Sequence, residues 1–193
     1  MTITTNKKSL EQIKKFFDKN DWKPLPFQIE SWEAYLNGEN GIIQVPTGCG
    51  KTYAALMGPL LKLNDCRKKS GLNILLITPL KALSRDLKNA IDSAAKYFDE
   101  EITVGIRNGD TSPYEKKKQI QNPPNILITT PESLSLLLSN KESKNIFKNL
   151  FSIIIDEWHE LLGSKRGNQC ELSLSWLRAV SYTHLTLPTK VTV

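Results

Sequence analysis

The chain has 193 residues, of which 39% are hydrophobic and 24% are charged, as is typical of a globular protein with a core. No apolar run is long enough to cross a bilayer and no signal peptide is visible, so we expect no membrane partner. Its three separated cysteines favour reduced thiols and a cytoplasmic location over a disulfide framework. The formal net charge of +6 permits a polyanionic partner without indicating one.

Two helices are predicted near the N-terminus. Apolar side chains recur at helical spacing within residues 9–18. Two prolines in residues 21–26 then break the helix, and residues 27–36 fit a second one.

From residue 41 onwards, short apolar runs alternate with helical segments. The runs that fit strands are residues 41–45, 73–78, 102–106, 125–130 and 151–156. The helices expected among them begin near residues 50, 81 and 131. Strands that are apolar on both faces and are separated by helices predict an α/β fold, a parallel sheet covered on both sides. Ligands bind such sheets at the carboxyl ends of the strands, where the motifs below lie.

A glycine-rich loop joins the first predicted strand to its helix, with the sequence Val45-Pro-Thr-Gly-Cys-Gly-Lys-Thr52. Its glycines allow a tight turn that presents amides to phosphate, and the helix dipole favours an anion there. Lys51 can reach the β- and γ-phosphates of ATP, and Thr52 can coordinate Mg²⁺. The other predicted ATP ligands in the loop are Thr47, Gly48, Cys49 and Gly50. The alternative is a glycine turn that binds no ligand and only precedes a core helix; the order of strand, loop and helix disfavours it.

Two adjacent acids end the last predicted strand. Asp156 can hold Mg²⁺ and Glu157 can orient or deprotonate the attacking water. A solvated strand end is the alternative, but the upstream phosphate loop makes it the weaker one. His159 is expected to link the nucleotide site to the nucleic-acid side, so the predicted catalytic residues are Lys51, Asp156, Glu157 and His159.

Taken in order, these motifs resemble those of superfamily-two DExH-box helicases. Asp156-Glu-Trp-His159 resembles the second helicase motif, and the stretch to Gly167 is similar to the large helicase-related group, most of all to its bacterial DNA-ligase-associated members. The resemblance covers about residues 22–177. It implies a RecA-like P-loop domain in an ATP-dependent helicase that acts on DNA in repair, with a DNA ligase as a functional associate. An RNA or RNA–DNA hybrid helicase and a nucleotide-binding module without turnover stay open.

The resemblance also implies further contacts. Pro24-Leu-Pro-Phe-Gln28 resembles the Q motif, in which Gln28 would read the adenine edge. Trp22 and Phe27 could stack on adenine or pack the N-terminal helices onto the sheet. Segments after three strands resemble motifs that grip the nucleic-acid backbone without reading its sequence. The residues expected to do so are Pro79, Lys81, Gly109, Asp110, Thr130, Pro131 and Glu132. Lys81, Arg85 and Arg107 could add positive charge to these contacts, although each is expected to be a solvated surface residue.

We expect three parts in the chain: a helical lead-in (1–25), the first RecA-like domain (26–179) and a C-terminal tail (180–193). The tail resembles a peptide encoded in one frame by a transposase-based sequencing adapter, so we interpret it as non-native; a natural β-rich strand is the alternative. Members of the resembled group continue into a second motor domain, which we do not find here. This 193-residue piece is therefore expected to bind ATP weakly and to unwind nothing.

Overall fold

The computed structural model describes residues 3–46, 48–66, 70–79, 82 and 84–180. The chain forms two compact units, which divide after Cys66. In this described part, no helix is long and apolar enough to span a membrane.

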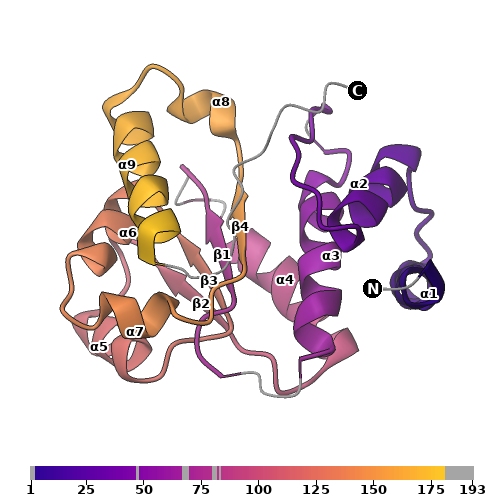
Figure 1. Ribbon diagram of the computed structural model, residues 1–193, viewed down its shortest axis with the longest axis horizontal. Helices are drawn as coiled ribbons and strands as arrows, with labels where there is room; N and C mark the ends of the chain where they lie inside the picture. The colour runs from indigo at the N-terminus through magenta and orange to yellow at the C-terminus, as the bar shows by residue number, and fades with distance from the viewer. Residues whose placement is uncertain (1–2, 47, 67–69, 80–81, 83, 181–193) are drawn as a thin grey trace. The chain divides into compact units, whose positions relative to one another are not determined.

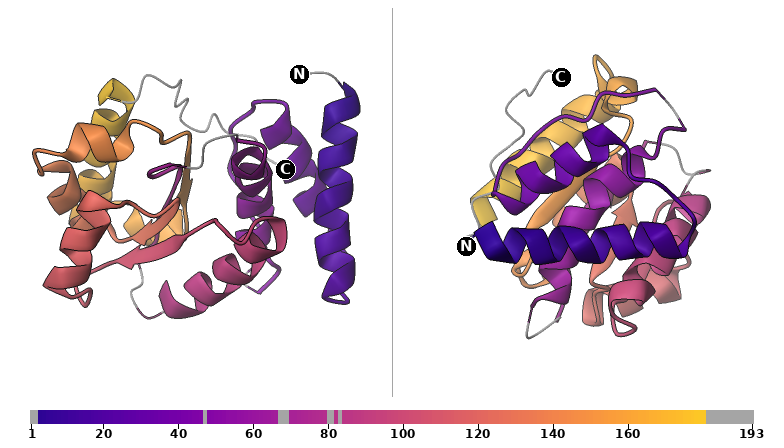
Figure 2. Two further views of the ribbon diagram at one scale, coloured as in Figure 1. Left: turned by 90° about the horizontal axis from the view of Figure 1, so that it is seen from below. Right: turned by 90° about the vertical axis from the view of Figure 1, so that its right-hand side faces the viewer.

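The first unit is helical. Its helices are α1 (Ile3–Lys19), α2 (Pro26–Leu36) and α3 (Lys51–Asn64). Figure 2 shows α1 lying against the other two helices. An aromatic cluster joins all three, with ring centroids 5.2 to 6.1 Å apart: Phe16, Phe17, Trp22, Trp32 and Tyr53. Trp22 therefore packs against aromatic side chains of α1 and α3 within the first unit.

The prediction of a strand at residues 41–45 is wrong. This segment has no ladder of strand hydrogen bonds in the structure, and Ile42 is 48% exposed. A short apolar run becomes a strand only where a neighbouring strand satisfies its amides and carbonyls. The four strands of the described sheet all belong to the second unit, whereas this run belongs to the first.

The second unit is built on a parallel sheet with the order β2-β3-β1-β4 (Figure 1). The strands are β1 (Ile74–Ile77), β2 (Val104–Arg107), β3 (Ile126–Thr129) and β4 (Ser152–Ile155). Strand β1 is central: Ile74 is in register with Ile126 on one side and with Ser152 on the other. The α/β fold with a parallel sheet is confirmed, with four of the five predicted strands in place.

Helices cover both faces of this sheet, as predicted. Figure 1 shows α4 (Ser84–Phe98) on one side and α6 (Pro131–Leu138) with α9 (Lys165–Val180) on the other. Leu75, Ile77 and Leu127 belong to the buried cluster that α6 and α9 complete. Alternation along a strand turns Ile74 and Leu76 to the opposite face, and these are equally buried. The remaining helices are α5 (Pro113–Gln121), α7 (Ser143–Phe147) and α8 (Trp158–Leu161).

A buried asparagine ties together the amino end of the sheet. Asn125 Oδ1 accepts hydrogen bonds from both the backbone N–H and the hydroxyl of Thr103, each at 3.0 Å. Its Nδ2 donates to Gly71 O at 3.3 Å and to Asn73 Oδ1 at 3.2 Å. These bonds close the amino end with structural contacts, whereas the predicted functional residues of this unit follow the carboxyl ends of its strands.

Candidate functional site

The phosphate loop adopts a backbone that favours glycine. Gly48 has φ +84° and Gly50 has φ +80°, in the left-handed region that side chains disfavour. Helix α3 begins directly after Gly50, so Lys51 and Thr52 occupy its first turn, where both are half-buried. The first amides of a helix have no intrahelical partner and carry positive partial charge, which suits a phosphate group. Thr47 lies outside the described residues.

Gln28 is bonded to this loop. Its side chain is 3% exposed; Oε1 accepts from Leu25 N at 2.9 Å, and Nε2 donates to Gly50 O at 3.1 Å. The first bond caps α2, and the second joins α2 to the phosphate loop. A side-chain amide keeps one further lone pair and one further N–H beyond these two bonds. Adenine reading by Gln28 thus stays a prediction, while its contact with the loop is part of the fold.

The predicted acid pair follows β4 directly. The N–H of Asp156 donates to Ile77 O at 2.8 Å and so extends the pairing with β1 by one residue. Asp156 Oδ1 accepts from Glu157 N at 3.1 Å. Glu157 itself has φ 47° and ψ 47°, a left-handed backbone that costs a residue with a side chain about 1–2 kcal/mol. A strained residue beside a second half-buried acid, at the carboxyl end of a strand, is typical of a functional position.

His159 lies beside Glu157. Its Nδ1 is 3.4 Å from Glu157 Oε2, and its Nε2 is 3.6 Å from Glu160 Oε1. The imidazole is 67% exposed, so the core does not hold it in place. This geometry brings together two of the predicted catalytic residues, and the linking role of His159 stays a prediction.

The predicted nucleic-acid residues follow the other three strands. Pro79 comes after β1, Gly109 and Asp110 come after β2, and Thr130 comes after β3. Parallel strands end at the same edge of their sheet, so these loops share one edge with the acid pair. Lys81 lies outside the described residues.

Two of these loops are ordered by side chains within them. Asp110 N donates to Asn108 Oδ1 at 3.0 Å in the loop after β2. Thr130 is the N-cap of α6, where its hydroxyl oxygen accepts from Ser133 N at 3.4 Å. Pro131 follows at the first position of the helix, where it is buried and where proline is favoured.

The expectation that Arg107 is a solvated surface residue is wrong. Arg107 is 8% exposed, and its Nη1 donates to Lys116 O at 3.0 Å and to Gln119 Oε1 at 3.4 Å. Burial lowers the pKa of this guanidinium from its ordinary value. Arg107, the last residue of β2, therefore joins this strand to α5.

Glu132 is paired with an arginine that the motifs did not single out. Arg166, in the first turn of α9, directs Nε to Glu132 Oε1 and places Nη2 3.3 Å from Glu132 Oε2. The same Nη2 donates to Pro79 O at 2.8 Å. Arg166 belongs to the helicase-like stretch that ends at Gly167, but only the fold shows that it meets two predicted loops.

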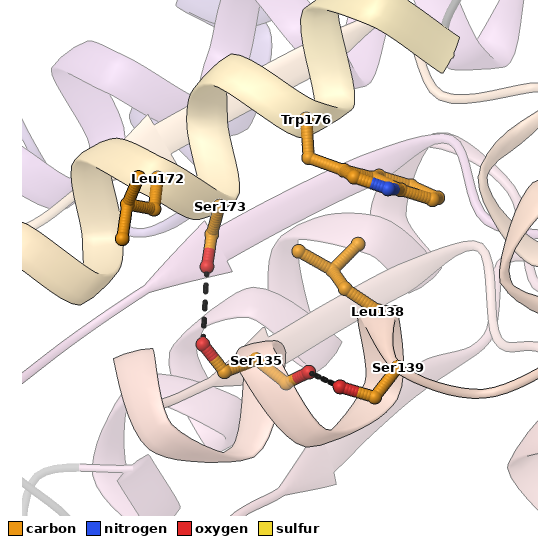
Figure 3. A pocket seen from close by; sticks show the side chains of 6 residues that line it. All are labelled: Ser135, Leu138, Ser139, Leu172, Ser173 and Trp176. Carbon is orange, nitrogen blue, oxygen red and sulfur yellow. Dashed lines mark hydrogen bonds between the residues drawn. The ribbon is translucent and has the colours of Figure 1, made fainter.

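A shallow hollow lies between α6 and α9 (Figure 3). It measures about 280 Å³ and is lined by Ser135, Leu138, Ser139, Leu172, Ser173 and Trp176. Figure 3 shows the Ser135 and Ser173 hydroxyls facing each other across it, 3.4 Å apart. None of its lining residues was predicted to be functional.

The donor set suits magnesium held together with a nucleotide. Thr52 and Asp156 offer oxygen atoms, which Mg²⁺ prefers, and Mg²⁺ usually takes its other ligands from phosphates and water. Within the described ranges there is no cluster of three histidine, cysteine or acidic residues that could hold a metal ion by itself. A magnesium site formed by Thr52, in the first unit, and Asp156, in the second, stays a prediction.

The fold and the site define a class of protein. A glycine loop at a helix N-terminus and an acid pair that ends a strand of a parallel sheet are typical of P-loop nucleotide-binding domains. The family model described as DEAD/DEAH box helicase matches residues 25–191, and the chain belongs to that family.

Three relatives define the likeness more narrowly. The Lhr helicase/uracil glycosylase of Escherichia coli is 37% identical over 83% of this chain, and the ATP-dependent helicase Lhr-Core of Sulfolobus acidocaldarius is 42% identical over 67%. The solved structure of Mycobacterium smegmatis helicase Lhr bound to ssDNA and AMP-PNP superposes with a TM-score of 0.82 and 33% identity over 96% of the chain. The chain spans 12%, 16% and 24% of these relatives, respectively. The prediction of a superfamily-two helicase domain is confirmed, and these relatives are of the Lhr type; their names mention no ligase.

Proposed function

We propose that this chain is the ATP-binding motor domain of a longer ATP-dependent helicase that moves along DNA. The observation that carries the proposal is that the acid pair and the loops predicted to contact the nucleic-acid backbone follow strands that end at one edge of the sheet. In such an arrangement, only a few residues separate the bound nucleotide from the nucleic acid, so ATP binding or hydrolysis can alter the contacts with the nucleic acid. Membership of the DEAD/DEAH box family supports it, as does the small share of the Lhr relatives that the chain spans.

Each residue of the nucleotide site has a role in this proposal. Lys51 would neutralise charge on the β- and γ-phosphates of ATP. Thr52 and Asp156 would hold Mg²⁺, which would supply further positive charge for phosphoryl transfer. Glu157 orients the attacking water and accepts its proton. His159, next to Glu157, carries the state of the nucleotide site towards the nucleic acid. Gln28 reads adenine with the bonding capacity that it does not use on Leu25 and Gly50.

A matched pair of lysine variants tests ATP binding. Lys51→Ala removes the predicted phosphate ligand at the start of α3, and Lys62→Ala removes an exposed lysine from the last turn of the same helix. Binding of a fluorescent ATP analogue to this chain should be lost in the first variant and retained in the second. Equal binding by both variants would contradict the assignment of the loop.

We place DNA ahead of RNA as the nucleic acid, because the Mycobacterium smegmatis Lhr structure is described as bound to ssDNA. Backbone contacts alone discriminate weakly, and a protein distinguishes the two polymers mainly through the 2′-hydroxyl. ATP turnover of the longer helicase should be stimulated more by single-stranded DNA than by RNA of the same sequence. Stronger stimulation by RNA, or by an RNA–DNA hybrid, would favour the alternative substrate.

The biological setting stays a set of predictions from the resemblance. These are a role in DNA repair, a functional association with a DNA ligase and a cytoplasmic location. Co-purification of a ligase with the tagged full-length protein from its own cells would support the association, and its absence from such preparations would count against it.

A further inference from the structure

Arg166 bridges two loops that are far apart in the sequence. One is the end of β1, where Pro79 O accepts from Nη2. The other is the first turn of α6, where the two carboxylate oxygens of Glu132 meet Nε and Nη2. A guanidinium matches a carboxylate through two parallel N–H groups, which fixes direction as well as distance. The three groups therefore hold the end of β1 and the start of α6 at a set separation.

The start of α9, which carries Arg166, is itself held rigidly. Ser164 Oγ donates to Leu161 O at 2.7 Å and accepts from Gly167 N at 3.1 Å. Gly167 approaches the preceding turn so closely that a Cβ on it would overlap Leu161 O. The corner between α8 and α9 thus fixes the backbone on both sides of Arg166.

The charge of Glu132 argues against direct contact with a nucleic acid. A carboxylate repels phosphate, yet Glu132 lies in the turn that is predicted to grip the strand. Burial by itself would raise the pKa of Glu132, but the hydrogen bonds and the charge of Arg166 outweigh it and hold the pKa below its ordinary value. The ionised Glu132 faces Arg166, which gives this carboxylate a function within the protein.

We propose that Arg166 is a positioning residue for nucleic-acid binding. Through its contacts with Glu132 and Pro79, it holds in place the start of α6 and the end of β1, two segments predicted to contact the nucleic-acid backbone. This inference rests on the proposed function. In this inference Arg166 does not contact the nucleic acid itself; it fixes where Pro79 and the first turn of α6 lie relative to each other. The pair is partly exposed, with 39% of the arginine side chain and 45% of the glutamate side chain accessible, so water screens its contribution to stability.

The test compares single-strand binding by the full-length protein and its variants over a range of salt concentrations. Arg166→Gln should weaken binding about fivefold or more, the low end of coupling between linked sites. Glu132→Gln should weaken it similarly, although this change removes a negative charge near a polyanion. Arg166→Lys keeps the charge and most of the stem but loses the planar fork, so it should restore only part of the affinity. Arg178→Gln, at the other end of α9, is the matched control and should bind like the wild type.

The outcomes separate positioning from direct contact. A positioning residue leaves the slope of log affinity against log salt unchanged, whereas loss of a direct phosphate contact reduces it by about one. The inference is overturned if Glu132→Gln binds as tightly as the wild type or more tightly, or if Arg166→Gln lowers the slope by about one. Thermal unfolding of each variant shows whether it is folded. If Arg166→Gln does not fold, the same comparison is made with Arg166→Lys. A wild-type protein that binds no single strand would overturn the proposed function itself.

Discussion

Replacing Gly50 by alanine should disturb both the phosphate loop and its contact with α2. At φ +80°, an alanine costs about 1–2 kcal/mol relative to glycine. The new Cβ would also lie 2.7 Å from Gln28 Nε2, so the glutamine must move. Movement breaks its bonds to Gly50 O and Leu25 N, each of which contributes about 1 kcal/mol. The total predicted loss in the free energy of unfolding is about 3–4 kcal/mol.

Gly38 provides the matched control. Its φ is +85°, and a Cβ placed on it meets no atom within 4 Å, so Gly38→Ala should lose only the backbone part, about 1–2 kcal/mol. Urea unfolding of both variants, followed by tryptophan fluorescence, measures the difference. Equal losses for Gly38→Ala and Gly50→Ala would show that the Gln28 contact contributes nothing, and would refute this reasoning.

Three further predictions concern the second unit. Asn125→Ala leaves the partners of four hydrogen bonds at the amino end of the sheet unsatisfied and should destabilise the protein by about 2–4 kcal/mol in the same urea assay; a loss below about 1 kcal/mol would contradict this. The folded-state pKa of Glu132 is lowered, so its contribution to stability is present above the unfolded glutamate pKa and is lost as pH falls through the folded value. The difference in the free energy of unfolding between the wild type and Glu132→Gln should therefore shrink on acidification. A difference that grows as the pH falls would contradict the lowered pKa of Glu132. Burial raises the pKa of Cys170 to about 11, so iodoacetamide at pH 8 should label Cys49 and Cys66 of the native protein but spare Cys170, as mass spectrometry of the peptides would show.

The sheet was predictable because buried parallel strands leave a strong pattern. Residues 74–77 and 126–129 form four-residue runs that are buried on both faces, as is typical of a parallel sheet covered on both sides. The acid pair was predictable for a related reason, since Asp156 and Glu157 abruptly end the apolar run of β4.

Other features depend on contacts between distant segments. Residues 41–45 have a strand-like composition, but pairing decides whether a strand forms, and composition does not report pairing. The buried position of Arg107 depends on acceptors 9 and 12 residues away on α5. Arg166 meets Glu132 and Pro79 across 34 and 87 residues. No local pattern encodes separations of this kind, so the charges of both arginines were visible in the sequence but their partners were not.

The most direct test of the central proposal is ATP turnover by the full-length protein, with and without single-stranded DNA, in the wild type and in Glu157→Gln. We expect turnover in the wild type that DNA stimulates. The variant should retain binding of the ATP analogue but lose turnover by a factor of about 100 or more, the scale of general base catalysis. Turnover that is unchanged in Glu157→Gln, or a wild type that binds ATP without hydrolysing it, would contradict the motor and would favour a passive nucleotide-binding module.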